Sequence, residues 1–143
     1  MALSAVKDNK ITIIGDGTQV RSFVHVKDTA AAYKKILETD TEVVNNQIYN
    51  VGSNEQNYSI LQLADIIEKV IGRGIPREFS GKIDSRNYSI DFSKIRGIGF
   101  KPRYSVDDGV RELKIAIEKQ VIEYENKNTR TDDWYEYVKP NAV

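Results

Sequence analysis

Tyr135 and Lys139 have the spacing of a tyrosine base and the lysine that supports it in proton transfer. Such a pair works on a helix, which places residues four apart on the same face. Pro140 follows directly and disfavours helical backbone at Lys139. With 8 tyrosines in the chain, a chance match to this spacing is also expected. We therefore predict that Trp134–Tyr137 is an aromatic tail that packs on the protein or a partner, and not a catalytic segment.

A glycine-rich turn, Gly15-Asp16-Gly17, follows a β-branched run and invites comparison with a dinucleotide-binding loop. That loop needs G-x-G-x-x-G at the start of a helix, with an acidic residue about 20 positions later. Val20 stands at the third glycine position, and a second alternating run follows it. The sequence therefore predicts a turn between two strands, and no cofactor-binding residue in this chain.

Residue counts argue against metal and nucleic-acid chemistry. The chain has no cysteine and a single histidine, His25, so thiolate and multi-histidine metal sites are excluded. We expect His25 to pack within a strand. The formal net charge is zero and no basic stripe is visible, which argues against duplex binding. Because cysteine is absent and no apolar run approaches about 20 residues, we expect a cytoplasmic protein without a membrane span.

Apolar spacing and capping signals predict five helices. Ser59-Ile60-Leu61-Gln62 and Ser105-Val106-Asp107-Asp108 are capping boxes, and Asp28 is expected to cap a third helix. The first helix has barely two turns, which is marginal for an isolated helix. We therefore expect it to be the end of a longer helix, and the chain to be a fragment. The predicted helices are residues 3–8, 28–38, 59–72, 91–97 and 105–124.

Short β-branched or alternating runs predict strands at residues 11–14, 21–26, 47–51 and 76–79. The expected fold class is α/β: a small mixed domain of three or four short strands and four or five helices, with no Rossmann sheet of its own. We expect residues 1–124 to form this domain, and residues 125–143 to be a polar linker and aromatic tail.

Several segments, taken together and in order, resemble one family. The longest, from Gly15 to Asp28, resembles the signature G-x-G-x-Q-x-R-[DS]-[FY]-[IV]-[HY]-V-x-D of the NAD-dependent epimerase/dehydratases, the extended short-chain dehydrogenase/reductases. That signature lies in the C-terminal half of the family. The other matching segments are Tyr49-Asn50-Val51-Gly52-Ser53, Asp84-Ser85-Arg86, Asp91-Phe92-Ser93-Lys94, and Gly99-Phe100-Lys101-Pro102 followed by Asp108-Gly109.

The resemblance has departures. Ser22 stands where aspartate is commonest in the family, and Lys27 where an acid is common. The family's N-terminal half, with its glycine-rich cofactor loop and its Ser/Thr, Tyr and Lys catalytic residues, has no counterpart in this sequence. The resemblance therefore implies a chain without catalytic residues that binds no cofactor alone, with NAD(P) held by the other half of a full-length parent.

The resemblance assigns Arg21 and Arg86 to the diphosphate of a nucleotide sugar. Guanidinium groups suit this role because they stay charged and offer paired, planar donors. Gln19, Asn50 and Tyr88 are further candidates for substrate binding, the tyrosine by stacking on a base or sugar. The alternative is that both arginines lie on the surface or pair with Asp16 and Asp84.

The predicted function is therefore the substrate-binding part of an NAD-dependent nucleotide-sugar epimerase/dehydratase, inactive alone. Its expected partners are a nucleoside-diphosphate sugar and the missing N-terminal Rossmann half, with a homo-oligomer also considered. Two alternatives stay open. One is a stand-alone nucleotide-sugar-binding module, and the other is a non-catalytic docking domain whose uncovered apolar face associates with another chain.

Overall fold

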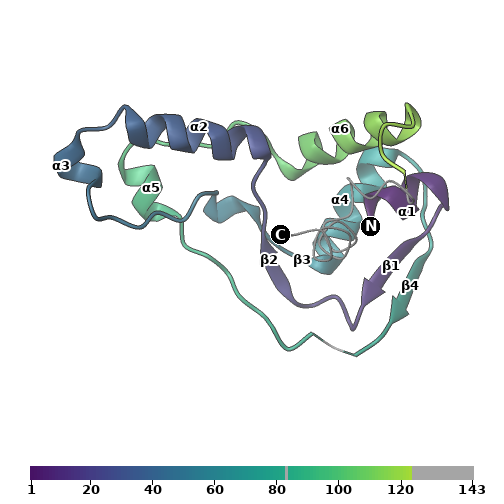
Figure 1. Ribbon diagram of the computed structural model, residues 1–143. Coiled ribbons are helices and arrows are strands. Elements are labelled where there is room, and N and C mark those ends of the chain that lie inside the picture. Colours follow the sequence, from purple (N-terminus) through teal and green to yellow (C-terminus); the bar gives the residue numbers. More distant parts are fainter. Residues whose placement is uncertain (83, 124–143) are drawn as a thin grey trace, which may run out of the picture.

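The computed structural model describes residues 1–82 and 84–123 (Figure 1). The domain limit predicted at residue 124, the linker, the aromatic tail and the Tyr135–Lys139 pair lie outside the described residues. Helices α2, α3 and α5 lie at one end of the molecule, and α1, β1 and β4 lie at the other (Figure 1). The elements are α1 (Ala2–Lys7), β1 (Ile11–Ile14), β2 (Val20–Ser22), α2 (Val26–Leu37), α3 (Thr41–Val44), the 3-10 turn η1 (Asn54–Gln56), β3 (Asn57–Ser59), α4 (Ile60–Ile71), β4 (Arg77–Ser80), α5 (Ser93–Gly97) and α6 (Val106–Glu118).

The strands form two separate two-stranded ladders. β1 pairs with β4 in parallel, with Ile11 opposite Arg77, and β2 pairs with β3 in antiparallel fashion, with Val20 opposite Ser59. The two strands that flank the Gly15–Gly17 turn therefore do not form a hairpin. Among the described residues there is no larger sheet, which confirms the predicted small mixed α/β fold. The additional helix is α3, whose four residues are too short to show a helical period.

Both predicted capping boxes are confirmed. The Ser59 hydroxyl accepts a hydrogen bond from the Gln62 amide at 3.1 Å, and the Gln62 side chain accepts from the Ser59 amide at 2.8 Å. Ser105 and Asp108 make the same reciprocal pair at the start of α6. These caps satisfy amide groups that a helix N-terminus leaves without intrahelical partners. They fix where α4 and α6 begin.

One hydrophobic core lies among α1, β1, α4 and α6. Its buried members are Ala5, Ile11, Ile13, Ala64, Ile67, Ile75 and Val110. A second, smaller core joins α2 to α5 and to the loop that follows α5. Its buried members are Ala32, Phe92, Ile95 and Phe100.

The strand predicted at residues 47–51 is wrong. These residues are extended coil, and within the described chain the backbone of residues 48–52 makes no backbone hydrogen bond. A β-branched run becomes a strand only beside a neighbouring strand that completes the ladder. The neighbour of β2 is instead β3, a three-residue polar segment that carries little strand signal.

The cap predicted at Asp28 is also wrong. The N-cap of α2 is His25, whose Nδ1 accepts a hydrogen bond from the Lys27 amide at 3.2 Å. His25 therefore lies after β2, which ends at Ser22, and not within a strand. Asp28 is buried in the first turn, where its carboxylate accepts from the Arg103 and Tyr104 amides at 2.9 and 3.0 Å. The acid ties α2 to the loop before α6.

Candidate functional site

Arg21 projects from β2, beside the segment that begins at Asp84. Strand pairing places Arg21 opposite Tyr58 on β3. Its Nη2 donates to Asp84 Oδ2 at 2.8 Å, and its Nη1 donates to the carbonyl oxygens of Val20 and Arg86 at 2.7 and 2.6 Å. These bonds hold the guanidinium in one place although residues 84–88 form no helix or strand.

Arg86 binds the same carboxylate. Its Nε and Nη2 donate to the two oxygens of Asp84 at 2.9 and 2.8 Å, and its amide donates to Oδ1 at 3.0 Å. The Arg86 side chain is 79% exposed, whereas Arg21 is 19% exposed. One carboxylate thus orients two guanidinium groups from segments more than 60 positions apart in sequence.

The electrostatics of this cluster are dominated by the paired arginines. The hydrogen bonds from Arg86 hold the pKa of the Asp84 carboxyl well below its ordinary value, and the charge of Arg21 adds to the effect. The same pairing raises the pKa of Arg86. Asp84 therefore stays ionised at neutral pH and cancels one of the two positive charges. One net positive charge remains, which favours an anionic ligand.

Tyr88 completes the cluster. The Arg21 guanidinium carbon lies 5.0 Å from the centre of the Tyr88 ring, within the range of a cation–π contact. Next to Tyr88 in sequence, Asn87 accepts through Oδ1 a hydrogen bond from the Val20 amide at 2.9 Å, which holds the segment against β2. The structure therefore brings together three predicted binding residues, Arg21, Arg86 and Tyr88.

The other two predicted residues lie outside this cluster. Gln19 is buried, and its Nε2 donates to the Ile14 carbonyl at 3.0 Å across the turn between β1 and β2. Its Oε1 is buried without a hydrogen-bond partner among the described residues. Asn50 makes a long 3.5 Å hydrogen bond to the Asp91 carbonyl. Within the described residues, no hydrogen bond joins either side chain to Arg21.

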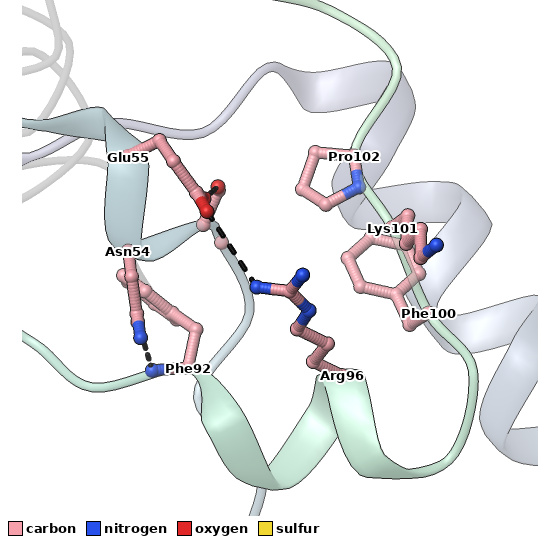
Figure 2. A pocket seen from close by; sticks show the side chains of 9 residues that line it. Asn54, Glu55, Phe92, Arg96, Phe100, Lys101 and Pro102 are labelled. Atoms are coloured by element: carbon pink, nitrogen blue, oxygen red, sulfur yellow. Dashed lines mark hydrogen bonds and ion pairs between the residues drawn. The ribbon is translucent and has the colours of Figure 1, made fainter.

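Apart from this cluster, a hollow of about 180 Å³ lies between η1, α5 and the loop after α5 (Figure 2). Arg96 and Glu55 face each other across it at 3.6 Å, and Asn54 Oδ1 accepts from the Phe92 amide at 2.7 Å. No sequence pattern pointed to Glu55 or Arg96, because neither belongs to a motif that carries chemistry. The lining residues are Gly52, Ser53, Asn54, Glu55, Phe92, Arg96, Phe100, Lys101 and Pro102.

His25 joins a structural cluster at the junction of α2 and α6. Its ring stacks on Tyr104 with 4.6 Å between ring centres, and its Nε2 lies 3.3 Å from Glu112. Lys27 donates to Glu112 at 2.6 Å, which raises the pKa of Lys27 and lowers that of Glu112. Because Nδ1 accepts the capping hydrogen bond, the neutral ring carries its proton on Nε2. These contacts account for His25 as a capping and packing residue.

No group of three or more histidine, cysteine, aspartate or glutamate side chains in residues 1–82 and 84–123 is arranged to hold a metal ion. In the same residues, no helix is both long and apolar enough to cross a bilayer.

Comparison with known proteins identifies what this chain is similar to. A family model described as the NAD dependent epimerase/dehydratase family matches residues 1–52. The dTDP-glucose 4,6-dehydratase 1 of Escherichia coli (strain K12) is 27% identical over 154 residues, which cover 98% of this chain and 38% of that enzyme. UDP-glucuronate 4-epimerase of Thermodesulfobacterium geofontis (strain OPF15) is 30% identical over 108 residues, which cover 73% of this chain and 32% of that enzyme.

The similarity extends to solved structures. The crystal structure of UDP-glucuronic acid 4-epimerase from Bacillus cereus, in complex with UDP-glucuronic acid and NAD, matches with a TM-score of 0.70 and 25% identity. The match covers 83% of this chain and 38% of that one. The chain thus spans little more than a third of the length of these relatives, and its fold is that of their C-terminal part.

Proposed function

Because the chain belongs to the NAD-dependent epimerase/dehydratase family, we propose that it is the substrate-binding part of a nucleotide-sugar epimerase or dehydratase. It holds the nucleoside diphosphate of the sugar and has no turnover alone. The B. cereus relative was solved with a UDP-sugar and NAD, which supports a nucleotide sugar as the ligand class. We also propose that the protein acts in the cytoplasm, a reducing compartment that suits a cysteine-free sequence.

The observation that carries this proposal is the pair of arginines on one carboxylate. Asp84 holds Arg86 by Nε and Nη2, which leaves Nη1 without a protein acceptor among the described residues. A diphosphate offers several anionic oxygens, and a guanidinium can bind two of them at once. Arg21 and Arg86 would therefore hold the diphosphate from two sides, with Asp84 keeping both guanidinium groups in position.

The structural support for the other predicted binding residues, Tyr88, Gln19 and Asn50, differs. The Tyr88 ring already lies against Arg21, so a base or sugar bound there can stack on it. Gln19 and Asn50 stay in the proposal as polar contacts at the edge of the site. Their present hydrogen bonds, to Ile14 and Asp91, assign them mainly to structure.

The Gly15–Gly17 turn does not have the form of a dinucleotide-binding loop. A dinucleotide loop presents its amide groups at the N-terminus of a helix. Here the Gly15–Gly17 turn leads into β2, and Asp16 caps its own turn by accepting from the Thr18 amide at 3.0 Å. We therefore assign no cofactor contact and no catalytic step to this chain, and propose that a separate Rossmann half would supply both.

A calorimetric titration of the 143-residue protein with UDP, dTDP, GDP, CDP and NAD tests the proposal. We expect one nucleoside diphosphate to bind and NAD not to bind. Arg21→Ala should weaken that binding by roughly ten- to a hundredfold, the cost of about 1.5–3 kcal/mol for a charge-assisted hydrogen bond. Arg21→Lys should restore only part of the affinity, because an ammonium group lacks the paired donors.

Arg111→Ala is the matched control. Arg111, like Arg21, is paired with an aspartate, Asp108 at 3.0 Å, but it is more exposed and lies on α6. Its removal should leave nucleotide affinity unchanged. Equal losses for Arg21→Ala and Arg111→Ala, or no binding of any nucleoside diphosphate, would contradict the proposed site.

The two alternatives separate in the same experiments. A stand-alone nucleotide-sugar-binding module would bind through the same arginines and show no turnover with any cofactor-binding partner chain. A docking domain would associate without nucleotide affinity.

A further inference from the structure

A polar hollow of about 260 Å³ lies between one face of α2 and the segment that joins α5 to α6. The Arg103 and Tyr104 amides donate to Asp28, so this segment runs alongside α2 (Figure 1). None of the residues around the hollow belongs to the arginine cluster on Asp84. The charged residues that line it are Asp28, Lys34, Lys35, Glu38, Lys101 and Arg103.

The unpaired cations of the protein gather at this hollow. Most lysine and arginine side chains make an ion pair, a hydrogen bond or a cation–π contact. Those that make none of these contacts within residues 1–82 and 84–123 are Lys35, Lys82, Lys101, Arg103 and Lys119. Three of them, Lys35, Lys101 and Arg103, line the same hollow.

The carboxylates beside the hollow do not neutralise these cations. Asp28 is 1% exposed and accepts from two backbone amides at 2.9 and 3.0 Å. Glu38 pairs with Lys34 at 3.6 Å. Four cations and two carboxylates line the hollow, so its formal net charge is +2 in a chain whose total is zero. The cations repel one another in the free protein, and a bound anion would remove that repulsion.

The backbone on both sides of the hollow is held in place. A Cβ atom at Gly99 would lie 3.8 Å from Lys35 Nζ, so this ammonium group reaches from α2 to the opposite segment. Phe100 is buried in the second core, and the Arg103 amide is hydrogen-bonded at 2.9 Å. Lys101 therefore lies between two anchored residues. The three cations surround a preformed space, which lowers the entropic cost of binding.

Charge and shape favour a small anion over another protein surface as the occupant. Lysine is depleted in the cores of protein interfaces, whereas ammonium and guanidinium groups bind multivalent oxyanions through charge-assisted hydrogen bonds. Pockets for drug-sized ligands have volumes of about 300–1,000 Å³, so this hollow suits a compact ligand. An apolar protein surface would instead meet Val26, Tyr33 and Leu37, which are exposed on α2 but do not line the hollow.

From these observations we propose that the hollow binds a small multivalent oxyanion, of the class of polyphosphates and tricarboxylates, through Lys35, Lys101 and Arg103. The anion would link α2 to the segment between α5 and α6, next to the contact that Asp28 already makes. The site shares no residue with the proposed nucleotide site, so it does not depend on that proposal.

Calorimetric titration with tripolyphosphate and with citrate tests the proposal. The titrations use the Arg21→Ala variant, so that the proposed diphosphate site does not contribute. We expect one bound anion per chain for at least one of the two probes. Adding Lys101→Ala should weaken that binding about tenfold through loss of a charge-assisted hydrogen bond. The melting temperature without ligand should not fall, because the Lys101 side chain makes no contact of its own among the described residues and its removal relieves repulsion.

Lys119→Ala, in the same Arg21→Ala background, is the matched control. Lys119 is likewise without a partner among the described residues, but it lies at the C-terminal end of α6. It should leave the affinity for the anion unchanged. Binding of neither probe, or equal losses for Lys101→Ala and Lys119→Ala, would overturn the proposal.

A second measurement separates this site from the nucleotide site. In a protein that retains Arg21, Lys101→Ala should leave the affinity for the nucleoside diphosphate unchanged. An equal loss of nucleotide and anion affinity would show that the hollow is not a separate site. Failure of every nucleoside diphosphate to bind would contradict the proposed function alone, because the anion titrations do not use the arginine cluster.

Discussion

The two hydrophobic cores of this protein are stabilised in different ways. The first core is enclosed by α1, α4 and α6 and by the parallel pair β1 and β4. Regular backbone hydrogen bonds and apolar burial therefore support each other there. The second core, around Phe92 and Ile95, is covered on one side by α2, whose outer face is apolar and exposed.

Side-chain amides replace a backbone ladder around the second core. Asn57 accepts from the Ile90 amide and donates to the Ile90 carbonyl, both at 3.1 Å. Asn54 accepts from the Phe92 amide at 2.7 Å. These bonds hold an extended segment in place without a neighbouring strand. The second region therefore depends on a few specific polar side chains, whereas the first depends on packing spread over many apolar side chains.

Truncating one buried isoleucine in each core should give the largest effects and rank the two regions. Ile13→Ala should lower the free energy of unfolding by about 4 kcal/mol, because its cavity lies between a sheet and helices that cannot easily collapse. Ile95→Ala should cost about 2–3 kcal/mol of unfolding free energy, because residues around the smaller core can move to fill part of the cavity. Urea unfolding of both variants measures the difference, and a larger loss for Ile95→Ala would reverse the comparison.

Removing the buried carboxylate of Asp28 should come next in size. Asp28→Ala leaves the Arg103 and Tyr104 amides without acceptors, so we expect a loss of about 3 kcal/mol in unfolding free energy. Asp16→Ala is the control, since Asp16 is a near-surface acid that caps only its own turn, and it should cost under about 1 kcal/mol. Similar losses for the two variants would show that the second region does not depend on Asp28.

Adding a methyl group at Gly52 tests how tightly the second core is packed. A Cβ atom there would lie 2.6 Å from the Phe92 ring, so Gly52→Ala should cost about 2 kcal/mol through overpacking. Gly74→Ala is the matched control, because an added Cβ would meet no atom within 4 Å. Its unfolding free energy in urea should change by under about 0.5 kcal/mol. A tolerated Gly52→Ala would mean that the Phe92 ring shifts freely.

The sequence predicted the first region better than the second, for a physical reason. Local capping boxes and apolar spacing predict helices α4 and α6, and both signals are properties of nearby residues in the sequence. β1 is likewise a run of four β-branched residues, and β4, whose only apolar residue is Phe79, pairs with it in parallel. Local signals and tertiary packing agree in this region, and so the elements were found.

The errors fall where long-range contacts decide the structure. Residues 47–51 have strand-like composition but no partner strand among the described residues. Asp28 has the residue type of a helix cap, but it is buried and accepts hydrogen bonds from amides 75 and 76 positions away. For the candidate site, residue type and family resemblance selected Arg21, Arg86 and Tyr88. The alternative interpretation paired the arginines with Asp16 and Asp84, and both in fact pair with Asp84: Arg86 from two positions away and Arg21 from 63 positions away.

The smallest effect we predict is the dependence of stability on the Asp84 carboxyl at low pH. Its pKa is lowered in the folded protein, so its pairing with Arg86 and Arg21 stabilises the fold above the unfolded pKa of about 3.9. That contribution is lost as the pH falls below about 4 towards the folded pKa, because the unfolded chain then binds the proton first. Asp84→Asn should therefore flatten the acid limb of a plot of unfolding free energy against pH. The change should be modest, because Arg86 is largely exposed and solvent screens the pair.

Glu68→Gln provides the comparison in the first region, where hydrogen bonds from Arg77 lower the pKa of Glu68. Suppose that Asp84→Asn leaves the acid limb unchanged while Glu68→Gln flattens it. The pairing of Asp84 with Arg21 and Arg86 would then contribute nothing to the stability of the free protein, and the Arg21 guanidinium would be held by its hydrogen bonds to backbone carbonyls alone.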